Sequence, residues 1–513
     1  MIEAPTLWQL IEERARATPE ARMAVDPSGR EIDFATYREA ALRTAGGLVD
    51  LGVGPGVTVS WMLTTRIESL ILIGALSRLD AIQNPILPIY RTREVRFIAT
   101  QCRPHLLILP NAAPTFDYPE MGREIAAELG ELSTLVVDNA LPGNDDAILP
   151  PPPPCLPADE LAVRWLFYTS GTTADPKGAQ HTDASLWPAA KGMCLGLQID
   201  SDDRVAFVFP LTHIGGINWL QASLATGCSL ILIENFAAPE TMSILRQTEM
   251  TLATAGTVFH EAYLKAHRES AEKPLFPSVR AMTGGGAPKP PQLHYDVRRE
   301  MGGAGIISGY GLTECPIITM ASIGDPDDKL AETEGRRSLP EVEIRVVRAD
   351  EMIADDDEEG EIRARGPQLF RGYLDATLDA AAFDSEGYLR TGDLGRIDAD
   401  GFLTITGRLK DVIIRKGENI PAKEIEDLLY LHRKVADVAA IGLPDPASGE
   451  RCCAIVVCKN PDDPLEFGEM QAFLRDQGLM IQKIPEQLEI LTEIPRNPTG
   501  KILKHELRAR YAD

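Results

Sequence analysis

The stretch "YTSGTTADPKGAQ", Tyr168 to Gln180, carries two glycines, one lysine and several hydroxyl side chains within thirteen residues. Glycine lets the backbone approach a ligand closely, hydroxyl groups donate hydrogen bonds, and lysine supplies a point charge. Together these properties suit a polyphosphate. The stretch contains no G-x-x-x-x-G-K-[ST] pattern, so it is not the loop of a P-loop NTPase.

The segments on either side of this loop predict where it lies in the fold. The apolar run "LAVRWLFY" (161–168) precedes it, and the helix-like "DASLWPAAKGMCL" (183–195) follows. We therefore expect the loop to begin at the end of a strand and to lead into the helix. Loops at strand ends are where α/β sheets bind ligands.

The first 150 residues alternate between short apolar strands, such as "VTVSWML" (57–63), and helical stretches, such as "RIESLILIGALSRL" (66–79). This alternation predicts a layered α/β fold with a largely parallel sheet. Five prolines, Pro150 to Pro154, interrupt the pattern and are typical of a stiff surface connection. From Arg345 onward the pattern changes to short strands and turns.

The last hundred residues predict a smaller α/β unit with a helix from Ala422, strands around Val438 and Ala454, and a helix around Phe473. We place the boundary in "GRLKD" (407–411), which gives an N-terminal domain of residues 1–409 and a C-terminal domain of residues 410–513. The predicted fold class is α/β, with a large N-terminal domain of layered sheets and helices.

Composition limits the classes of function. A chain of 513 residues is too long for one ordinary core, and its net charge of -25 disfavours nucleic acid and anionic lipid as partners. The acidic start does not resemble a secretory signal, and no apolar run is long enough to span a membrane. We therefore expect a cytoplasmic protein without an integral membrane segment. Cys452, Cys453 and Cys458 lie in a predicted buried strand, which indicates reduced packing thiols.

Seven segments follow one another in a fixed order: "YTSGTTADPKG", "FPLTHIGG", "GGGAP", "GYGLTE", "TGD", "GRLKDVIIRKGENI" and "PRNPTGK". The set resembles the adenylate-forming superfamily of acyl-CoA synthetases, firefly luciferase and peptide-synthetase adenylation domains, over nearly the whole chain. The resemblance implies an AMP-forming acid–thiol ligase with a mobile C-terminal domain. Such an enzyme uses ATP, Mg²⁺ and coenzyme A, joins a carboxylic acid to AMP, and passes the acyl group to the thiol.

The resemblance also implies a site for the nucleotide. The residues implied to grip the β- and γ-phosphates are Thr169, Ser170, Gly171, Thr172, Thr173 and Lys177. Ala174 stands where the family usually has glycine, so we expect a stiffer loop and a tuned affinity for ATP. Tyr310 would stack on adenine, Thr313 would contact the α-phosphate, and Glu314 would hold Mg²⁺, for which one carboxylate plus phosphate oxygens can suffice.

Further roles follow from the later segments. The backbone at Gly285, Gly286, Ala287 and Pro288 would lie against adenine and the acyl group, and Asp393 with Arg408 would bind the ribose hydroxyls. Lys501 would be the catalytic lysine of adenylation. Rotation about Lys410 would then withdraw Lys501 and bring Arg415, Lys416 and Gly417 to the cleft, where the two cations would meet the phosphates of coenzyme A.

The acyl pocket implied by the resemblance contains His213, Ile214, Gly215, Trp219, Gly285 and Gly309. His213 would gate this pocket and takes part in catalysis in this interpretation. Amino-acid-activating relatives have aspartate where this chain has Ile214, and a buried ammonium without that partner would be heavily penalised. We therefore expect an aliphatic, alicyclic or aryl acid without a charged α-substituent.

Two alternatives stay open at this point. One is an acyl-AMP ligase that loads a carrier protein instead of coenzyme A. The other is a nucleotide-binding regulator that kept the fold and lost the chemistry. The sequence does not decide the oligomeric state, and a homodimer is left open.

Overall fold

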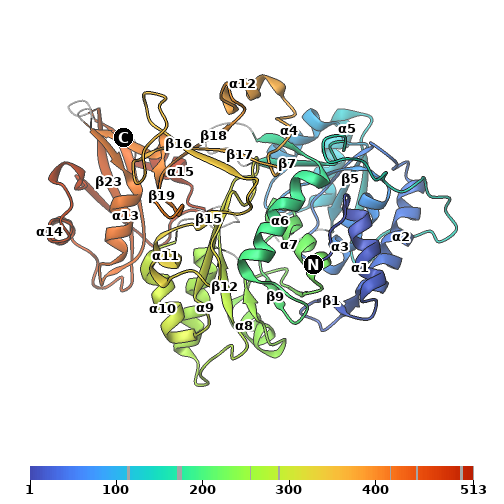
Figure 1. Ribbon diagram of the computed structural model, residues 1–513, viewed down its shortest axis with the longest axis horizontal. Helices are drawn as coiled ribbons and strands as arrows, with labels where there is room; N and C mark the ends of the chain where they lie inside the picture. Colours follow the sequence, from blue (N-terminus) through green and yellow to red (C-terminus); the bar gives the residue numbers. More distant parts are fainter. Residues whose placement is uncertain are drawn as a thin grey trace.

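The computed structural model describes residues 1–111, 116–169, 176–254, 256–286, 289–415, 418–445, 449–496 and 501–511 (Figure 1). It is a mixed α/β molecule with two mostly parallel sheets, one four-stranded antiparallel sheet and a five-stranded C-terminal sheet. In Figure 1 the C-terminal unit, labelled by β23 (Gly449–Cys458) and α14 (Phe467–Asp476), lies beside the large unit. The predicted fold class is therefore confirmed.

The first sheet has six strands, and only its last pair is antiparallel. Its order is β6 (Ser133–Val137), β5 (Leu106–Pro110), β3 (Thr58–Trp61), β4 (Ile82–Pro85), β7 (Trp165–Thr169) and β8 (Lys177–His181). The helices α3 (Ile67–Arg78), α4 (Thr92–Cys102) and α5 (Tyr118–Leu129) connect β3, β4, β5 and β6 in the sequence, and α2 (Phe34–Asp50) precedes β3. The strand that leads into the opening loop thus belongs to the sheet of the first 150 residues.

The second sheet has nine strands. Its order is β15 (Arg336–Arg337), β14 (Thr319–Met320), β13 (Ile306–Tyr310), β12 (Ala281–Gly284), β11 (Leu252–Ala253), β9 (Arg204–Phe207), β10 (Ser229–Leu232), β1 (Arg22–Val25) and β2 (Glu31–Asp33). The pairs from β13 to β1 are parallel, and the outer pairs are antiparallel. The carboxyl ends of β9, β12 and β13 therefore lie along one edge.

One hydrophobic core joins the two large sheets. It includes Trp61 of the first sheet, Phe207 of the second, and Leu186 and Leu220 from α6 (Asp183–Leu197) and α7 (Ile214–Thr226). The helices α1 (Leu7–Ala17), α8 (Ala238–Gln247), α9 (Thr257–Glu269), α10 (Pro291–Met301) and α11 (Asp327–Glu332) complete the helical part of the large unit. Because α6 and α7 share this core with both sheets, their ends are fixed relative to the strand ends.

The antiparallel sheet consists of β16 (Glu343–Val347), β17 (Gly360–Arg365), β18 (Leu389–Ile397) and β19 (Leu403–Arg408), with the short α12 (Asp379–Ala382) between β17 and β18. The C-terminal sheet has the order β21 (Glu418–Pro421), β20 (Val412–Arg415), β23 and β22 (Val435–Asp445), and β24 (Gln487–Leu491) pairs with β23. The helices α13 (Ala422–Tyr430), α14 and α15 (Lys504–Tyr511) accompany it. The elements predicted from Ala422, Val438, Ala454 and Phe473 are confirmed. A 3-10 turn, Leu409–Asp411, connects β19 to β20, and our proposed domain boundary falls there.

One local expectation was wrong. The opening loop does not lead directly into α6, because β8 lies between them and pairs antiparallel with β7. The other edge of β8 is also paired, since the Gln180 amide donates to the Gly372 carbonyl over 3.1 Å and the Leu374 amide donates to that of Gly178 over 2.7 Å. The mostly polar sequence "KGAQH" did not predict a strand, because these backbone partners lie almost two hundred residues away.

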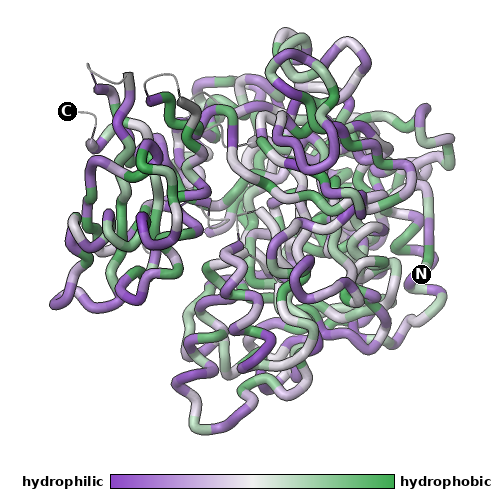
Figure 2. Tube along the Cα trace, turned by 60° about the vertical axis from the view of Figure 1, so that its left-hand side comes forward, coloured by the Kyte–Doolittle hydropathy of each residue, from purple (hydrophilic) through white to green (hydrophobic). Residues whose placement is uncertain are grey.

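The surface and the cysteines agree with a globular fold. Figure 2 shows hydrophobic residues interrupted by hydrophilic ones along the trace, and no helix within the described ranges is long and apolar enough to cross a membrane. Cys452 and Cys453 are buried in β23, Cys458 at the end of this strand is only partly buried against the same core, and every cysteine of the chain is a free thiol. The prediction of packing thiols at these positions is confirmed.

Candidate active site

Two adjoining cavities lie where strands of both large sheets end. The larger cavity has a volume of about 410 Å³. Five strands, β4, β7, β9, β12 and β13, each contribute to its lining a residue at or just after the strand end: Leu87, Thr169, Phe209, Gly285 and Gly311. The smaller cavity, of about 170 Å³, extends toward the C-terminal unit. Residues shared by both cavities are Gly286, Gly309, Gly311, Arg408, Lys410 and Lys501. The carboxyl ends of parallel strands are the usual ligand site in such sheets.

One wall of the larger cavity is the base of the opening loop. Thr169 and Lys177 are directly paired in the β7–β8 hairpin, and both line the cavity. The Lys177 ammonium lies 5.3 Å from the centre of the Tyr373 ring, a cation–π distance. The predicted phosphate residues Ser170, Gly171, Thr172 and Thr173 lie outside the described residues, as does Ala174.

Glu314 and Thr313 also line the larger cavity. The Glu314 carboxylate, with only 8% of the residue exposed, accepts a 2.6 Å hydrogen bond from the Tyr373 hydroxyl. The Thr313 carbonyl lies 2.8 Å from Nε2 of His181. Since a carbonyl only accepts, Nε2 must carry the proton, and burial lowers the pKa of His181 to about 4, so that the ring is neutral.

The donor set around Glu314 limits the metal that could bind. No group of three or more His, Cys, Asp or Glu side chains suited to a metal occurs in the described part of the chain. A single carboxylate cannot supply all the ligands of a cation from the protein. It does suit Mg²⁺, because this ion is usually bound by one or two carboxylates together with phosphate oxygens of a substrate and water.

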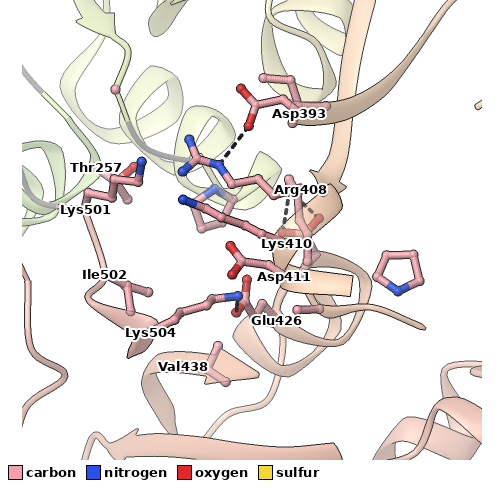
Figure 3. Close-up of a pocket in the computed structure, with 18 of the residues that line it drawn as sticks. Thr257, Asp393, Arg408, Lys410, Asp411, Glu426, Val438, Lys501, Ile502 and Lys504 are labelled. Atoms are coloured by element: carbon pink, nitrogen blue, oxygen red, sulfur yellow. Dashed lines mark hydrogen bonds and ion pairs between the residues drawn. The ribbon is translucent and has the colours of Figure 1, made fainter. Parts of the chain in front are cut away.

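A hydrogen-bonded cluster lines the smaller cavity. Asp393 in β18 stands opposite Arg408 in β19, and Nε of Arg408 lies 2.8 Å from one carboxylate oxygen (Figure 3). The Tyr310 hydroxyl donates to the other oxygen over 2.8 Å. Burial and the Asp393 carboxylate together raise the pKa of Tyr310 well above its ordinary value. The phenol therefore stays protonated and holds its ring at the cavity wall.

Lys501 brings a cation from the C-terminal unit to the junction of the two cavities. Figure 3 shows it near Arg408 and Lys410. Burial and these two positive neighbours lower the pKa of Lys501 to about 8, against opposing effects of Asp393 and Asp411. Three cations thus gather in a cleft of a chain whose net charge is -25. Such a local concentration of positive charge attracts an anionic ligand.

The N-terminus of α7 forms the other end of the larger cavity. Nδ1 of His213 accepts a 3.1 Å hydrogen bond from the Gly215 amide, and burial lowers the pKa of His213 to about 4. The ring is therefore neutral, with its proton on Nε2. Ile214 and Trp219 are buried and line this end, together with Met193, Leu197, Phe209, Phe259 and Ile317. The surface available here is predominantly apolar.

Two glycines that line this cavity lie close to atoms of the neighbouring segments. A Cβ at Gly309 would lie 2.9 Å from the sulfur of Met320, and one at Gly285 would lie 3.1 Å from the Gly309 carbonyl oxygen. A side chain at either position would therefore require its neighbour to shift. At both glycines the backbone itself borders the cavity.

The sequence did not identify Asn218, which also lines the larger cavity. It is 1% exposed, and its side-chain amide donates to the Leu186 carbonyl over 3.2 Å. His181 and Tyr373 were missed as well. Each acts through a contact with a residue more than fifty positions away, which no local pattern records.

Arg415, predicted to meet coenzyme A, does not line either cavity in this arrangement. It forms a 2.5 Å ion pair with Glu486 and donates to the Gln482 carbonyl over 2.5 Å, all within the C-terminal unit. Lys416 and Gly417, proposed to act with it, lie outside the described residues, as do Ala287 and Pro288.

Comparisons with known proteins agree with this geometry. Residues 11–374 match the family described as AMP-binding enzyme, and residues 424–501 match its C-terminal domain. The medium-chain fatty-acid–CoA ligase of Escherichia coli is 29% identical over 514 residues, which cover 98% of this chain and 89% of that protein. The salicyl-AMP ligase / salicyl-S-ArCP synthetase of Mycobacterium tuberculosis is 30% identical over 528 residues, covering 98% and 90%.

A solved structure supports the same assignment. The o-succinylbenzoate CoA synthetase of Bacillus subtilis, in complex with its acyl-adenylate intermediate, matches with a TM-score of 0.83 and 27% identity over 98% of both chains. The chain therefore belongs to the AMP-binding enzyme family, and it is an adenylate-forming enzyme of the acid–thiol ligase class.

Proposed function

We propose that the protein activates a carboxylic acid with an uncharged tail as its acyl-AMP and then transfers the acyl group to coenzyme A. The observation that carries this proposal is the position of Lys501, where a cavity with a charged wall meets an apolar one. A carboxylate at this junction would have its tail among apolar side chains and its charge beside three cations.

The nucleotide would occupy both cavities. Thr169 and Lys177 would hold the β- and γ-phosphates, and Tyr310, Asp393 and Arg408 would bind the adenosine in the smaller cavity. Glu314 would hold Mg²⁺, which supplies positive charge to the phosphate oxygens. The hydrogen bond from Tyr373 would orient the Glu314 carboxylate for that purpose.

Adenylation forms a bond between a carboxylate oxygen and the α-phosphorus of ATP and breaks the bond to pyrophosphate. Both reactants are anions, so the site must offset their repulsion as they meet. With a pKa of about 8, Lys501 is mostly protonated at pH 7 and can donate hydrogen bonds to carboxylate and phosphate oxygens. Thr313 would contact the same α-phosphate from the large domain.

The second half-reaction breaks the acyl–AMP bond and forms a thioester with coenzyme A. We propose that residues 410–513 rotate about Lys410, in the turn between β19 and β20, and replace Lys501 with the segment 415–419. Arg415 lines neither cavity in the present arrangement, which supports such a movement, because this residue would reach the cleft after a rotation.

The side chains that line the larger cavity are the basis for proposing that the tail of the acid is uncharged. Ile214, Trp219, Met193 and Leu197 offer no charge to pair with a substrate ammonium. An amino acid would therefore leave a buried cation without a partner. Neutral His213, which lines the same end of the cavity, favours an uncharged tail as well.

A second candidate function concerns the acceptor of the acyl group. The Mycobacterium tuberculosis relative carries a carrier-loading name, salicyl-S-ArCP synthetase, at 30% identity. The two acceptors are distinguished by measuring the rate of thioester formation with free coenzyme A and, separately, with an added carrier protein.

The proposed function is tested by exchange of labelled pyrophosphate into ATP, in the presence of Mg²⁺ and a panel of acids. The panel runs from short to long linear acids and includes cyclohexane and benzoic types. We expect exchange with at least one of them and none with the matching α-amino acids. Tight ATP binding without exchange for any acid would reject the proposal and favour a nucleotide-binding regulator.

A further inference from the structure

Lys501 is held in an unfavourable electrostatic position. Burial and the positive neighbours Arg408 and Lys410 lower its pKa, against opposing effects of Asp393 and Asp411. Before an anionic substrate binds, burial and the two neighbouring cations therefore disfavour the charged form of Lys501 in the cleft. Something in the C-terminal domain must hold the loop that carries it, and the residues on both sides of that loop form two ion pairs that adenylation chemistry does not use.

Backbone pairing joins the described residues on the two sides of Lys501. Arg496 and Ile502 form an isolated antiparallel bridge, and the Leu503 amide donates to the Pro495 carbonyl over 2.8 Å. Lys501 is adjacent to this pairing. Its position therefore depends on where Arg496 and Ile502 are fixed.

Arg496 is fixed by Asp437 of β22. Its Nη2 lies 2.8 and 2.9 Å from the two carboxylate oxygens of Asp437. One of these oxygens also accepts a 2.5 Å hydrogen bond from Tyr430, the last residue of α13, and a 2.9 Å bond from the Val438 amide. Charge-assisted hydrogen bonds that share one acceptor fix its geometry well.

A second pair fixes the other side of the loop. Nζ of Lys504 lies 2.7 Å from the Glu426 carboxylate, whose same oxygen accepts from the Ala440 amide over 2.8 Å. The two side chains are only 14% and 11% exposed. Figure 3 shows Lys504 and Glu426 below Lys501 in the same pocket. Lys501 thus lies between two cationic residues, each bound to a carboxylate of the C-terminal domain.

The first pair also lies at the boundary with the large domain. Tyr430 and Arg496 line the smaller cavity together with Thr257, the first residue of α9. Glu261, one turn further along α9, lies near the pair, because the charges of Asp437 and Arg496 act on its pKa in opposite directions. The cluster is therefore close to the large domain in the arrangement that inserts Lys501.

We propose that Asp437, through its ion pair with Arg496, positions Lys501 for adenylation and has no part in thioester formation. This inference rests on the proposed function, because it assigns Lys501 to the first half-reaction. Asp437 and Arg496 are positioning residues here, and they act through Lys501 rather than on the substrate.

The test measures the two half-reactions separately in the full-length chain. Asp437→Asn should slow acyl-AMP formation about 100-fold, since a misplacement of about 1 Å costs that much, and leave KM for ATP nearly unchanged. Conversion of supplied acyl-AMP and coenzyme A to thioester should keep its rate. Arg496→Met breaks the same pair from the other side and should act alike, and Arg496→Lys should recover part of the rate.

Asp463→Asn is the matched control. It removes a carboxylate of the same domain that forms a 2.8 Å ion pair with Lys434. The Asp463 side chain is 56% exposed, and this pair does not include the residues that flank Lys501. We expect it to change neither half-reaction.

A double variant separates positioning from a general loss of structure. In a Lys501→Ala background, Asp437→Asn should cause no further loss of adenylation, because the two residues act as a unit. A further loss of the same size, or an equal loss of both half-reactions, would overturn the inference, as would an unchanged adenylation rate in both Asp437→Asn and Arg496→Met. Failure of the unmodified chain to exchange pyrophosphate would instead reject the proposed function, and this inference with it.

Discussion

The charge of Lys501 gives the adenylation rate a predictable dependence on pH. The ammonium form is the active one, and burial beside Arg408 and Lys410 lowers its pKa to about 8. The adenylation rate that depends on this cation is therefore at its maximum well below pH 8, and it falls as the pH rises through the pKa. From that pKa, about 90% of the free enzyme carries the charge at pH 7 and about 10% at pH 9.

The assay is pyrophosphate exchange at limiting ATP and acid, where kcat/KM reports groups of the free enzyme. We expect kcat/KM to be flat near pH 7 and to fall about tenfold for each pH unit above roughly 8.5. Under saturating ATP the fall should move to higher pH, because the bound triphosphate favours the charged form of Lys501.

Lys501→Arg provides the decisive comparison. Arginine stays charged throughout this range, so the alkaline fall should disappear, although the plateau should be lower because the guanidinium has a different geometry. Lys265→Arg, at an exposed position of α9, is the matched control and should keep the wild-type profile. An alkaline fall of the same midpoint in Lys501→Arg would show that another group controls the reaction, and the assignment of the pH dependence to Lys501 would be wrong.

Three further variants test the remaining parts of the site. Asp393→Asn weakens the contacts to Arg408 and should raise KM for ATP about tenfold with little change in kcat, as measured by ATP titration; a fall in kcat alone would contradict a ribose role. Glu314→Gln should raise the Mg²⁺ concentration for half-maximal exchange about tenfold, and an unchanged Mg²⁺ titration would remove this residue from the metal site. Trp219→Ala enlarges the apolar cavity and should shift the preferred acid toward bulkier tails across the panel, whereas an unchanged ranking would place the tail elsewhere.

Much of the fold could be predicted because its strands and helices carry local patterns. The strand β7 is buried along nearly its whole length, which its continuous apolar run indicates, and α13 buries one face, which its residue spacing indicates. Motifs rich in glycine indicated the cavity in a similar way, since Gly285 and Gly309 both line it. In these cases the cause lies within a few residues of its effect.

The missed features depend on contacts between distant segments. β8 is a strand because β7 and the segment near Gly372 pair with its backbone, whatever its side chains. His181 contacts Thr313 across 132 positions, and Arg496 contacts Asp437 across 59. A single sequence carries no record of such pairings, so these residues look like ordinary polar positions until the chain is folded.

The three cations at the junction of the cavities have a consequence for traffic through the cleft. The chain as a whole carries a charge of -25, so an approaching nucleotide is repelled at long range and attracted only once it reaches the opening. Pyrophosphate and AMP are anions too, so the negative outer surface repels them once they have left the cleft. This repulsion slows their rebinding. Dissolved salt screens this outer field over about 10 Å while leaving the enclosed charges less affected, so ionic strength alters entry and exit more than the chemical step.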